Sequence, residues 1–218
     1  MSDLLQMLDM PFFRRALAAA ALIGFTNGFV SGFVLLRRSS LTLSALSHTL
    51  LPGIVVVVLI TGVLNQAGAF TGALLASLIV GIASITVTRY TRLPQSTAIA
   101  IFYTAAVALG VILIPYAHTS QNLEQWLFGT IQTMGDTDLK VFFGIACFTL
   151  MSSTLFMRPL LLTLFEPNVA AVQGVNVRRM NYLLYTLMIF ALMASFQAVG
   201  PILSIGLLVA PGAIISLF

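Results

Sequence analysis

The sequence has very few charged residues. Asp, Glu, Lys and Arg make up 7% of the 218 residues, whereas a soluble domain carries roughly 25%. Hydrophobic residues make up 59% of the chain, and its mean hydropathy is +1.06. Such a chain cannot cover a water-facing surface, so we expect an integral membrane protein. Its net charge of +4 then reports orientation in the bilayer and gives no indication of nucleic-acid binding.

Other chemical features are scarce as well. The single cysteine, Cys147, excludes an intrachain disulfide. The phosphate-binding pattern G-x-x-x-x-G-K-[ST] does not occur, so any ATP hydrolysis must be performed by another polypeptide. No pattern of paired carboxylates, nucleophile and base, or clustered histidines points to a membrane enzyme, which makes this class the least favoured. We expect no permanently bound cofactor.

Long apolar runs fill most of the chain. A helix needs about 20 apolar residues to cross the hydrocarbon core, and we therefore predict an all-α, polytopic membrane protein with one transmembrane domain over residues 1–218. The predicted apolar segments are 16–36, 41–62, 68–88, 94–115, 139–157, 181–199 and 200–218. Residues 158–180 mix apolar and charged residues and contain Pro159, Pro167 and Gly174. This region is expected to form one or two short helices along the membrane surface, although an ordinary interfacial linker fits its composition equally well.

The basic residues are distributed unevenly between the loops. Those in or beside loops 37–40, 89–93 and 158–180 are Arg37, Arg38, Arg89, Arg92, Arg158, Arg178 and Arg179; the others are Arg14, Arg15 and Lys140. Because cytoplasmic loops carry the excess of Lys and Arg, this distribution predicts an external N-terminus. Arg14 and Arg15 oppose the trend, and we expect them in an interfacial amphipathic helix over Met10–Leu17.

The stretch SALSHTLLPG (44–53) places an ionisable ring beside a helix breaker within an apolar run. Ser44 and His48 are four residues apart and share a helix face. Pro52 has no N–H to donate to the His48 carbonyl, and Gly53 allows a second backbone or an ion to approach. Neutral imidazole is a good ligand for divalent Zn, Mn or Fe. The alternative is that His48 bonds a hydroxyl on a neighbouring span and Pro52 only kinks the helix.

The loop 116–138 contains the second histidine, His118. It is either an ordinary exposed loop residue or a ligand that captures an incoming ion. Asp136 and Asp138, at the end of the same loop, are expected to cap the next helix, because a helix N-terminus favours negative charge.

Five stretches, taken in order, resemble motifs of the permease subunits of ABC-type importers for manganese, zinc and iron. They are FVLLRRSSLTLSALSHTLLPGI (33–54), STAIAIFYTAAVALGVILI (96–114), NLEQWLFGTI (122–131), LFEPNVAAVQGVNV (164–177) and FQAVGPILSIGLLVAPGA (196–213). Each motif is weak alone, but the five follow the order found in that family and cover most of the chain.

The resemblance implies a transmembrane permease subunit of an ATP-binding-cassette importer in the bacterial cytoplasmic membrane, with a divalent metal ion (Mn, Zn or Fe) as transported substrate. The implied partners are ATPase subunits, an extracytoplasmic metal-binding protein, the lipid bilayer and a second permease chain, either an identical copy or a related paralogue. His48 and Ser44 would be pathway ligands. Residues 164–177 would form the coupling helix that docks on the ATPase, with Phe165, Glu166, Pro167 and Gly174 as coupling residues.

The sequence departs from the family pattern in two ways, in certain residues and in the number of spans. Ser44 stands where that pattern usually has Asp, so the carboxylate expected to act together with His48 is replaced by a hydroxyl. Ser96 also stands where the family often has Asp. The family has about eight spans, whereas this chain ends within the seventh apolar segment. A missing C-terminal span, a shortened member and a degenerate gene remain open interpretations.

An ATP-independent carrier or channel is the alternative function, although it would need more ionisable groups inside the spans. A scaffold subunit without a pathway is a third hypothesis.

Overall fold

A computed structural model describes residues 10–37, 40–62, 65–117 and 135–217. These residues form α2 (Pro11–Leu36), α3 (Ser40–His48), α4 (Leu50–Thr61), α5 (Gln66–Tyr90), α6 (Gln95–Leu113), the 3-10 helix η1 (Ile114–Tyr116), α7 (Asp136–Leu155), α8 (Met157–Phe165), α9 (Pro167–Val172) and α10 (Val177–Ile215). Within the described ranges there is no β-strand. The predicted all-α fold class is therefore confirmed.

Six helical stretches are long and apolar enough to cross a membrane: Pro11–Leu36, Thr42–Thr61, Ala67–Tyr90, Gln95–Tyr116, Asp136–Leu155 and Val177–Gly200. Helices are the expected form, because hydrocarbon offers no hydrogen-bond partner and each backbone N–H and C=O must be satisfied within the segment. The protein is a multi-pass helical membrane protein.

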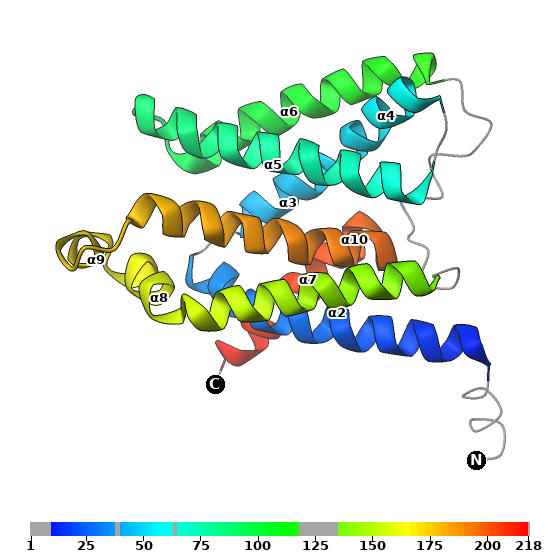
Figure 1. Cartoon of the computed structure of the whole chain (residues 1–218). Helices are drawn as coiled ribbons and strands as arrows, with labels where there is room; N and C mark the ends of the chain where they lie inside the picture. Colours follow the sequence, from blue (N-terminus) through cyan, green and yellow to red (C-terminus); the bar gives the residue numbers. More distant parts are fainter. Residues whose placement is uncertain (1–9, 38–39, 63–64, 118–134, 218) are drawn as a thin grey trace.

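The spans lie alongside one another, and their connections gather at two ends (Figure 1). One end, here called the α9 end, holds α8, α9, the C-terminal end of α2 and the turn between α5 and α6. The opposite end holds the first residues of α2, α5 and α7. This arrangement brings the basic residues around α8–α10 and the α5–α6 turn to the same end of the bundle.

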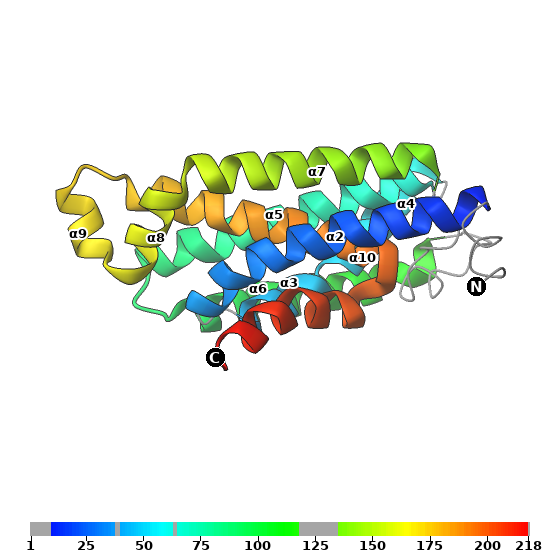
Figure 2. The ribbon, with the colours of Figure 1, turned by 90° about the horizontal axis from the view of Figure 1, so that it is seen from below.

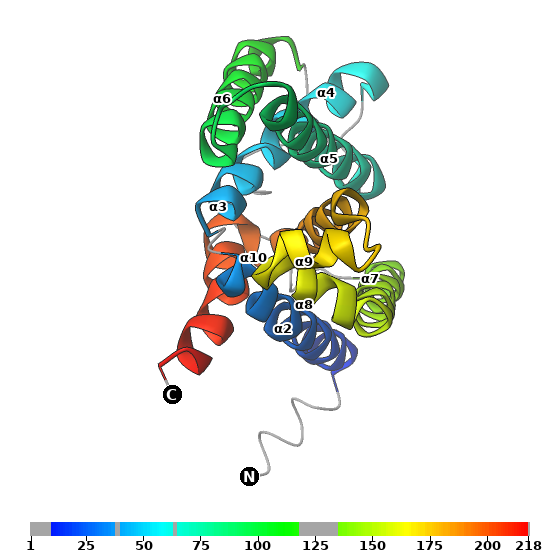
Figure 3. The ribbon, with the colours of Figure 1, turned by 90° about the vertical axis from the view of Figure 1, so that its left-hand side faces the viewer.

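The helices form two groups when the bundle is seen along its length (Figure 3). Helices α4, α5 and α6 form one group, α2, α7 and α10 form the other, and α3 lies between them. The first arm of α10 (residues 177–199) is central, and every residue from Ala191 to Ala198 is buried. Helix α10 as a whole packs against α2, α3, α5 and α7, so it joins the two groups.

Helix α10 folds back at Gly200. This residue has φ 80° and ψ 171°, a backbone conformation outside the helical region, and positive φ values are easily reached only by glycine. Beyond it, Leu203–Ile215 returns alongside α2 (Figure 2). The contact is close at Gly212, where an added Cβ would lie 2.7 Å from the Ser31 carbonyl oxygen. The last apolar segment therefore packs back onto the bundle.

Arg14 and Arg15 do not lie in a separate interfacial helix, contrary to the expectation for Met10–Leu17. They belong to the first turns of α2, which is continuous from Pro11 to Leu36. The physical reason is a partner on α7: the Arg15 Nε lies 2.7 Å from the Asp136 Oδ1. This ion pair holds the start of α2 against the start of α7.

Helices α4 and α5 touch through glycine. A Cβ added to Gly53 would overlap the Gly72 carbonyl oxygen, and one added to Gly72 would lie 2.5 Å from the Gly53 carbonyl oxygen. Without side chains at these positions, the two backbones can approach closely, which is how small residues serve helix pairs in membranes.

We predict that Gly53→Ala destabilises the protein by about 1–3 kcal/mol, because the added methyl group meets a backbone atom that cannot rotate away. The measurement is the temperature at which the detergent-solubilised protein loses its monodisperse chromatographic peak. Gly24→Ala in α2 is the control, since a Cβ there has no atom within 4 Å, and it should leave that temperature unchanged or raise it slightly. Equal behaviour of the two variants would contradict the close α4–α5 contact.

Candidate functional site

His48 lies at the C-terminal end of α3 and is exposed, although the span Thr42–Thr61 contains it. It lines a cavity of about 280 Å³ between α3 and α6, here called the His48 pocket. The lining residues are Thr42, Ser44, Ala45, His48, Ser96, Ile99, Ala100 and Tyr103. The predicted pair Ser44 and His48 thus shares one pocket, and Ser96 joins it from α6.

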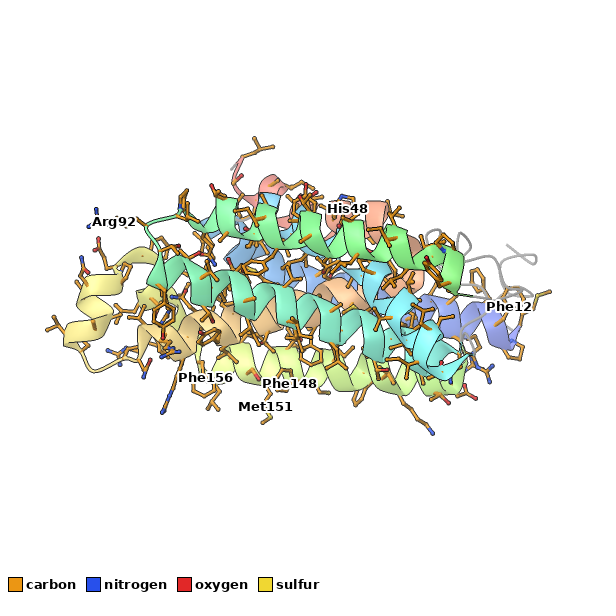
Figure 4. All side chains as sticks on the ribbon, turned by 90° about the horizontal axis from the view of Figure 1, so that it is seen from above. Phe12, His48, Arg92, Phe148, Met151 and Phe156 are labelled. Carbon is orange, nitrogen blue, oxygen red and sulfur yellow. The ribbon has the colours of Figure 1, made fainter. Side chains whose placement is uncertain are left out.

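The face that carries His48 is opposite a strongly apolar face of the bundle. Figure 4 shows His48 on one side, beside α6, and Phe148, Met151 and Phe156 on the other. Met151 is 70% exposed and Phe148 is 45% exposed, as expected for side chains in contact with lipid. An imidazole has a donor and an acceptor that lipid cannot satisfy, so the His48 face requires a polar or protein neighbour.

The helix is interrupted directly after His48. Helix α3 ends at His48 and α4 begins at Leu50, with Thr49 between them. The Thr49 backbone N–H and side-chain hydroxyl both donate to the Leu46 carbonyl, at 3.1 and 2.7 Å. This local bonding, together with the missing N–H of Pro52, accounts for a break at this position.

Pro52 and Gly53 do not line the His48 pocket. Pro52 packs against Gly110 of α6, where an added Cβ would lie 2.7 Å from the Pro52 Cβ, and Gly53 packs against Gly72 of α5. Of the two partners considered for Gly53, a second backbone and an ion, the structure shows the backbone. These two residues therefore position α4 against its neighbours, and Ser44 and His48 are the ones in the pocket.

Tyr103 is a pocket residue that sequence reasoning missed. Its ring centroid is 6.2 Å from that of His48, with the planes tilted by 32°. Ser96, Ile99, Ala100 and Tyr103 follow the 3–4 residue spacing of one helix face. That periodicity was the available signal, because it places Tyr103 on the same face of α6 as Ser96. A pocket that contains Ser96 is therefore expected to meet Tyr103 as well.

The N-terminal end of α6 is held in place by Arg37, at the end of α2. Its guanidinium donates to the Asn181 Oδ1 at 2.8 Å and to the Gln95 Oε1 at 3.2 Å. It also lies over the Tyr185 ring, 4.6 Å from the centroid. Burial lowers the pKa of Arg37 below its usual value. Because Gln95 precedes Ser96, these contacts fix where Ser96 enters the pocket.

Among the residues that the structure describes, no carboxylate lines the His48 pocket. Its polar side chains are one imidazole, the hydroxyls of Thr42, Ser44 and Ser96, and the phenol of Tyr103. In the part of the chain that the structure describes, no group of three or more His, Cys, Asp or Glu residues could hold a metal ion. The described residues of this pocket would therefore offer a metal ion neutral ligands.

The acidic residues at the start of α7 have a different role. The Asp138 Oδ2 accepts a hydrogen bond from the Gly135 backbone N–H at 2.9 Å, and its Oδ1 accepts one from the Gln197 Nε2 at 3.0 Å. Asp138 is buried and Asp136 pairs with Arg15. The expected capping role is confirmed for Asp138, whereas Asp136 lies in the first turn and pairs with Arg15. Both acids lie at the end opposite α9.

The four predicted coupling residues surround α9. Phe165 ends α8, Glu166 connects α8 to α9, Pro167 begins α9, and Gly174 follows it with φ +80°. The Val175 and Gly174 N–H groups donate to the Ala170 and Ala171 carbonyls, at 2.9 and 3.1 Å, the pattern of a glycine-ended helix.

The surface of α8 and α9 is apolar at its outermost points. Phe165 is 63% exposed, Val169 is 43% exposed and Val172 is 89% exposed, whereas Ala170 is fully buried. Such apolar side chains at a bundle end are typical of a contact surface for another protein. The predicted capture ligand His118 and the motif at 122–131 lie outside the described residues.

The comparisons with known proteins decide the family. The sequence pattern of the ABC 3 transport family matches residues 9–218. The chain belongs to this family. The resemblance identified from the five motifs is thereby confirmed.

Individual relatives cover nearly the whole chain. The manganese transport system membrane protein MntC of Halalkalibacterium halodurans is 37% identical over 95% of this chain and 70% of that protein. The chelated iron transport system membrane protein YfeD of Yersinia pestis is 34% identical over 94% and 67%. Among solved structures, PsaBC from Streptococcus pneumoniae in complex with Fab matches with a TM-score of 0.82 and 32% identity, covering 100% of this chain and 77% of that one.

We predict that Ser44→Cys reacts readily with a water-soluble methanethiosulfonate reagent, because Ser44 lines an open pocket. Ser47→Cys is the matched control: Ser47 is only 2% exposed and should react far more slowly. Both variants need a Cys147→Ser background, since Cys147 is itself exposed. The measurement is the labelling rate in detergent, read by mass spectrometry. Similar rates at the two positions would contradict the orientation of α3.

Proposed function

We propose that this chain is the membrane permease subunit of an ATP-driven importer for divalent transition metal ions, with His48 and Ser44 as low-affinity ligands in the pathway. The observation that carries the proposal is the exposure of His48 within a membrane span, in a pocket that it shares with Ser44 and Ser96. The named activities of the relatives, manganese and chelated iron transport, support this substrate class. Weak binding suits transit, since an ion that is held too tightly does not leave.

The proposed orientation places the α9 end in the cytoplasm of a bacterial cell and the N-terminus outside. Arg89, Arg92, Arg178 and Arg179 are exposed near the α9 end, as the positive-inside rule requires. At the opposite end the opposing charge of Arg15 is partly offset by its ion pair with Asp136.

This orientation assigns a partner to each end of the bundle. The ATPase subunit would dock on the α8–α9 surface, with Phe165, Glu166, Pro167 and Gly174 around the contact, and an extracytoplasmic metal-binding protein would deliver the ion at the opposite end. ATP binding would shift the permease between outward-open and inward-open packings. A second permease chain would cover the His48 face. The chain itself would have no catalytic role.

The proposal predicts that His48→Ala lowers metal uptake at least about tenfold, since even changes around a metal ligand cost that much. Uptake of Mn²⁺ and Fe²⁺ is measured in proteoliposomes that contain the permease and its ATPase. Ser47→Ala, one residue away but buried, is the control and should transport normally. Co-purification of the ATPase with both variants verifies assembly. Wild-type uptake by the His48→Ala complex would refute the role of His48.

The docking assignment is tested at Val172, the most exposed of the three apolar residues named on the α8–α9 surface. Val172→Asp places a charge in the proposed contact, and the stimulation of ATP hydrolysis by metal-loaded binding protein should be lost. Val172→Ile keeps the surface apolar and should retain this stimulation. Normal stimulation of ATP hydrolysis in the Val172→Asp complex would show that the ATPase docks elsewhere.

A further inference from the structure

Two arginines meet where α5 ends and α10 begins, at the α9 end of the bundle (Figure 1). The guanidinium carbon of Arg89 lies 5.6 Å from the centroid of the Tyr182 ring, and that of Arg178 lies 5.8 Å from the same centroid. Both arginines are exposed. The Tyr182 hydroxyl is 3.3 Å from the Thr86 hydroxyl of α5. Arg89, Arg178 and Tyr182 are here called the arginine clamp.

The arginine clamp carries positive charge without a matching carboxylate. Among the described residues, neither Arg89 nor Arg178 forms an ion pair. The ion pair that the structure shows joins Arg15 to Asp136, at the opposite end of the bundle. The tyrosine ring attracts both cations, but it does not neutralise them. Because an anion can accept hydrogen bonds from two guanidinium groups at once, the clamp has the chemistry of a phosphate or carboxylate site.

The depth of the clamp favours the phosphate of a lipid. Arg89 lies in the last turn of the membrane span Ala67–Tyr90. Arg178 lies in the first turn of the span Val177–Gly200. Lipid headgroups lie just beyond the hydrocarbon core, and tyrosine is enriched at this boundary. The phosphates of the surrounding lipids are therefore at about the depth of the two guanidinium groups.

An apolar stripe of α5 leads from the clamp toward the centre of the span. It consists of Leu75, Ile79 and Ile82, all of which are exposed. Their spacing of three to four residues places them on the helix face that also carries Thr86 and Arg89. From Arg89 to Ile79 the helix rises about 15 Å, which is about half the thickness of the hydrocarbon core. One acyl chain fills this depth, so the stripe has the length that an acyl chain requires.

The stripe adjoins an apolar groove of about 380 Å³ between α4, α5 and α6. Leu75 and Ile79 belong to both the stripe and the groove. Every residue that lines the groove is an apolar residue, a glycine or a proline, and small residues such as Gly72, Ala76 and Ala106 are among them. An acyl chain that follows the stripe away from the clamp would therefore reach a recess that matches it in polarity.

We propose that this face is a binding site for one anionic phospholipid, whose phosphate bridges Arg89 and Arg178 and whose acyl chain lies on the α5 stripe and ends in the groove. Positive charge at the headgroup depth and apolar surface below it complement the two parts of such a lipid. The groove shares no lining residue with the His48 pocket, so the site goes beyond the proposed transport function. A bound lipid would join α5 to α10 and thereby link the two groups of helices.

Lipid retention tests the proposal directly. The protein is purified with its partners in a mild detergent from a bacterial membrane, and native mass spectrometry identifies the lipid that remains bound, which we expect to be phosphatidylglycerol. Arg89→Gln with Arg178→Gln should lower its occupancy at least about tenfold, since each basic residue adds to the attraction for an anionic headgroup. Arg92→Gln is the matched control, because Arg92 is exposed in the neighbouring α5–α6 turn, and it should retain the lipid. Unchanged occupancy in the double variant would overturn the proposal.

Defined ligands test the two parts of the site separately. The delipidated protein is titrated with dipalmitoyl phosphatidylglycerol, and its affinity is compared with those for dipalmitoyl phosphatidylcholine and for dihexanoyl phosphatidylglycerol. The first lipid should bind at least about tenfold more tightly than either of the others, because only it has both the net negative charge and the long chain. Equal binding of phosphatidylcholine, equal binding of the short-chain lipid, or displacement of the long-chain lipid by millimolar inorganic phosphate would each overturn the proposal.

An acidic surface of the ATPase is the competing occupant at this end of the bundle. The ATPase content of the same purified samples is therefore measured. Loss of the ATPase from the Arg89→Gln, Arg178→Gln complex with lipid occupancy unchanged would show that protein occupies the clamp and would overturn the proposal. Arg89→Lys with Arg178→Lys keeps both charges and should restore most of the lipid occupancy. Failure of this rescue in a monodisperse protein would contradict recognition by charge.

Discussion

Hydrocarbon offers no hydrogen-bond partner, and the described structure depends on this constraint. It requires backbone groups to be satisfied within helices, and it makes exposure of the His48 imidazole on a membrane span a feature that another molecule must cover. The same constraint explains why serine and threonine hydroxyls of the spans bond back to their own helices, as Thr26 does to the Leu22 carbonyl and Ser84 to the Gly81 carbonyl. Between the spans, the buried Asn27 of α2 donates to the Ser195 hydroxyl of α10 at 2.6 Å.

Glycine supplies the close contacts that the fold needs. Gly53 and Gly72 bring α4 against α5, Gly110 receives Pro52 from α4, and Gly212 brings the end of α10 against α2. The first two of these contacts hold α4, α5 and α6 as one group of helices. In a membrane, such small-residue packing substitutes for the hydrophobic driving force that assembles a soluble core.

The α9 end is linked to the His48 pocket through the helices that lie between them. At the α9 end, the short helices α8 and α9 present apolar residues, while Arg37 ties α2 to α6 and α10. The His48 pocket lies between α3 and α6, and Arg37 contacts the start of α6 through Gln95. Helices α8 and α9 are thus connected to the pocket through their contacts with α10 and through the hydrogen bonds of Arg37 to Asn181 and Gln95.

Sequence alone was enough to establish the helical membrane class, the family and the pairing of Ser44 with His48, because hydropathy, motif order and helical spacing are all local properties. The tertiary structure was needed to show that Ser96 and Tyr103 of α6 join that pair, that Pro52 and Gly53 face other helices, and that α10 folds back at Gly200. These features depend on which helix faces lie against each other. Side-chain packing across distant segments decides that, and no single segment encodes it.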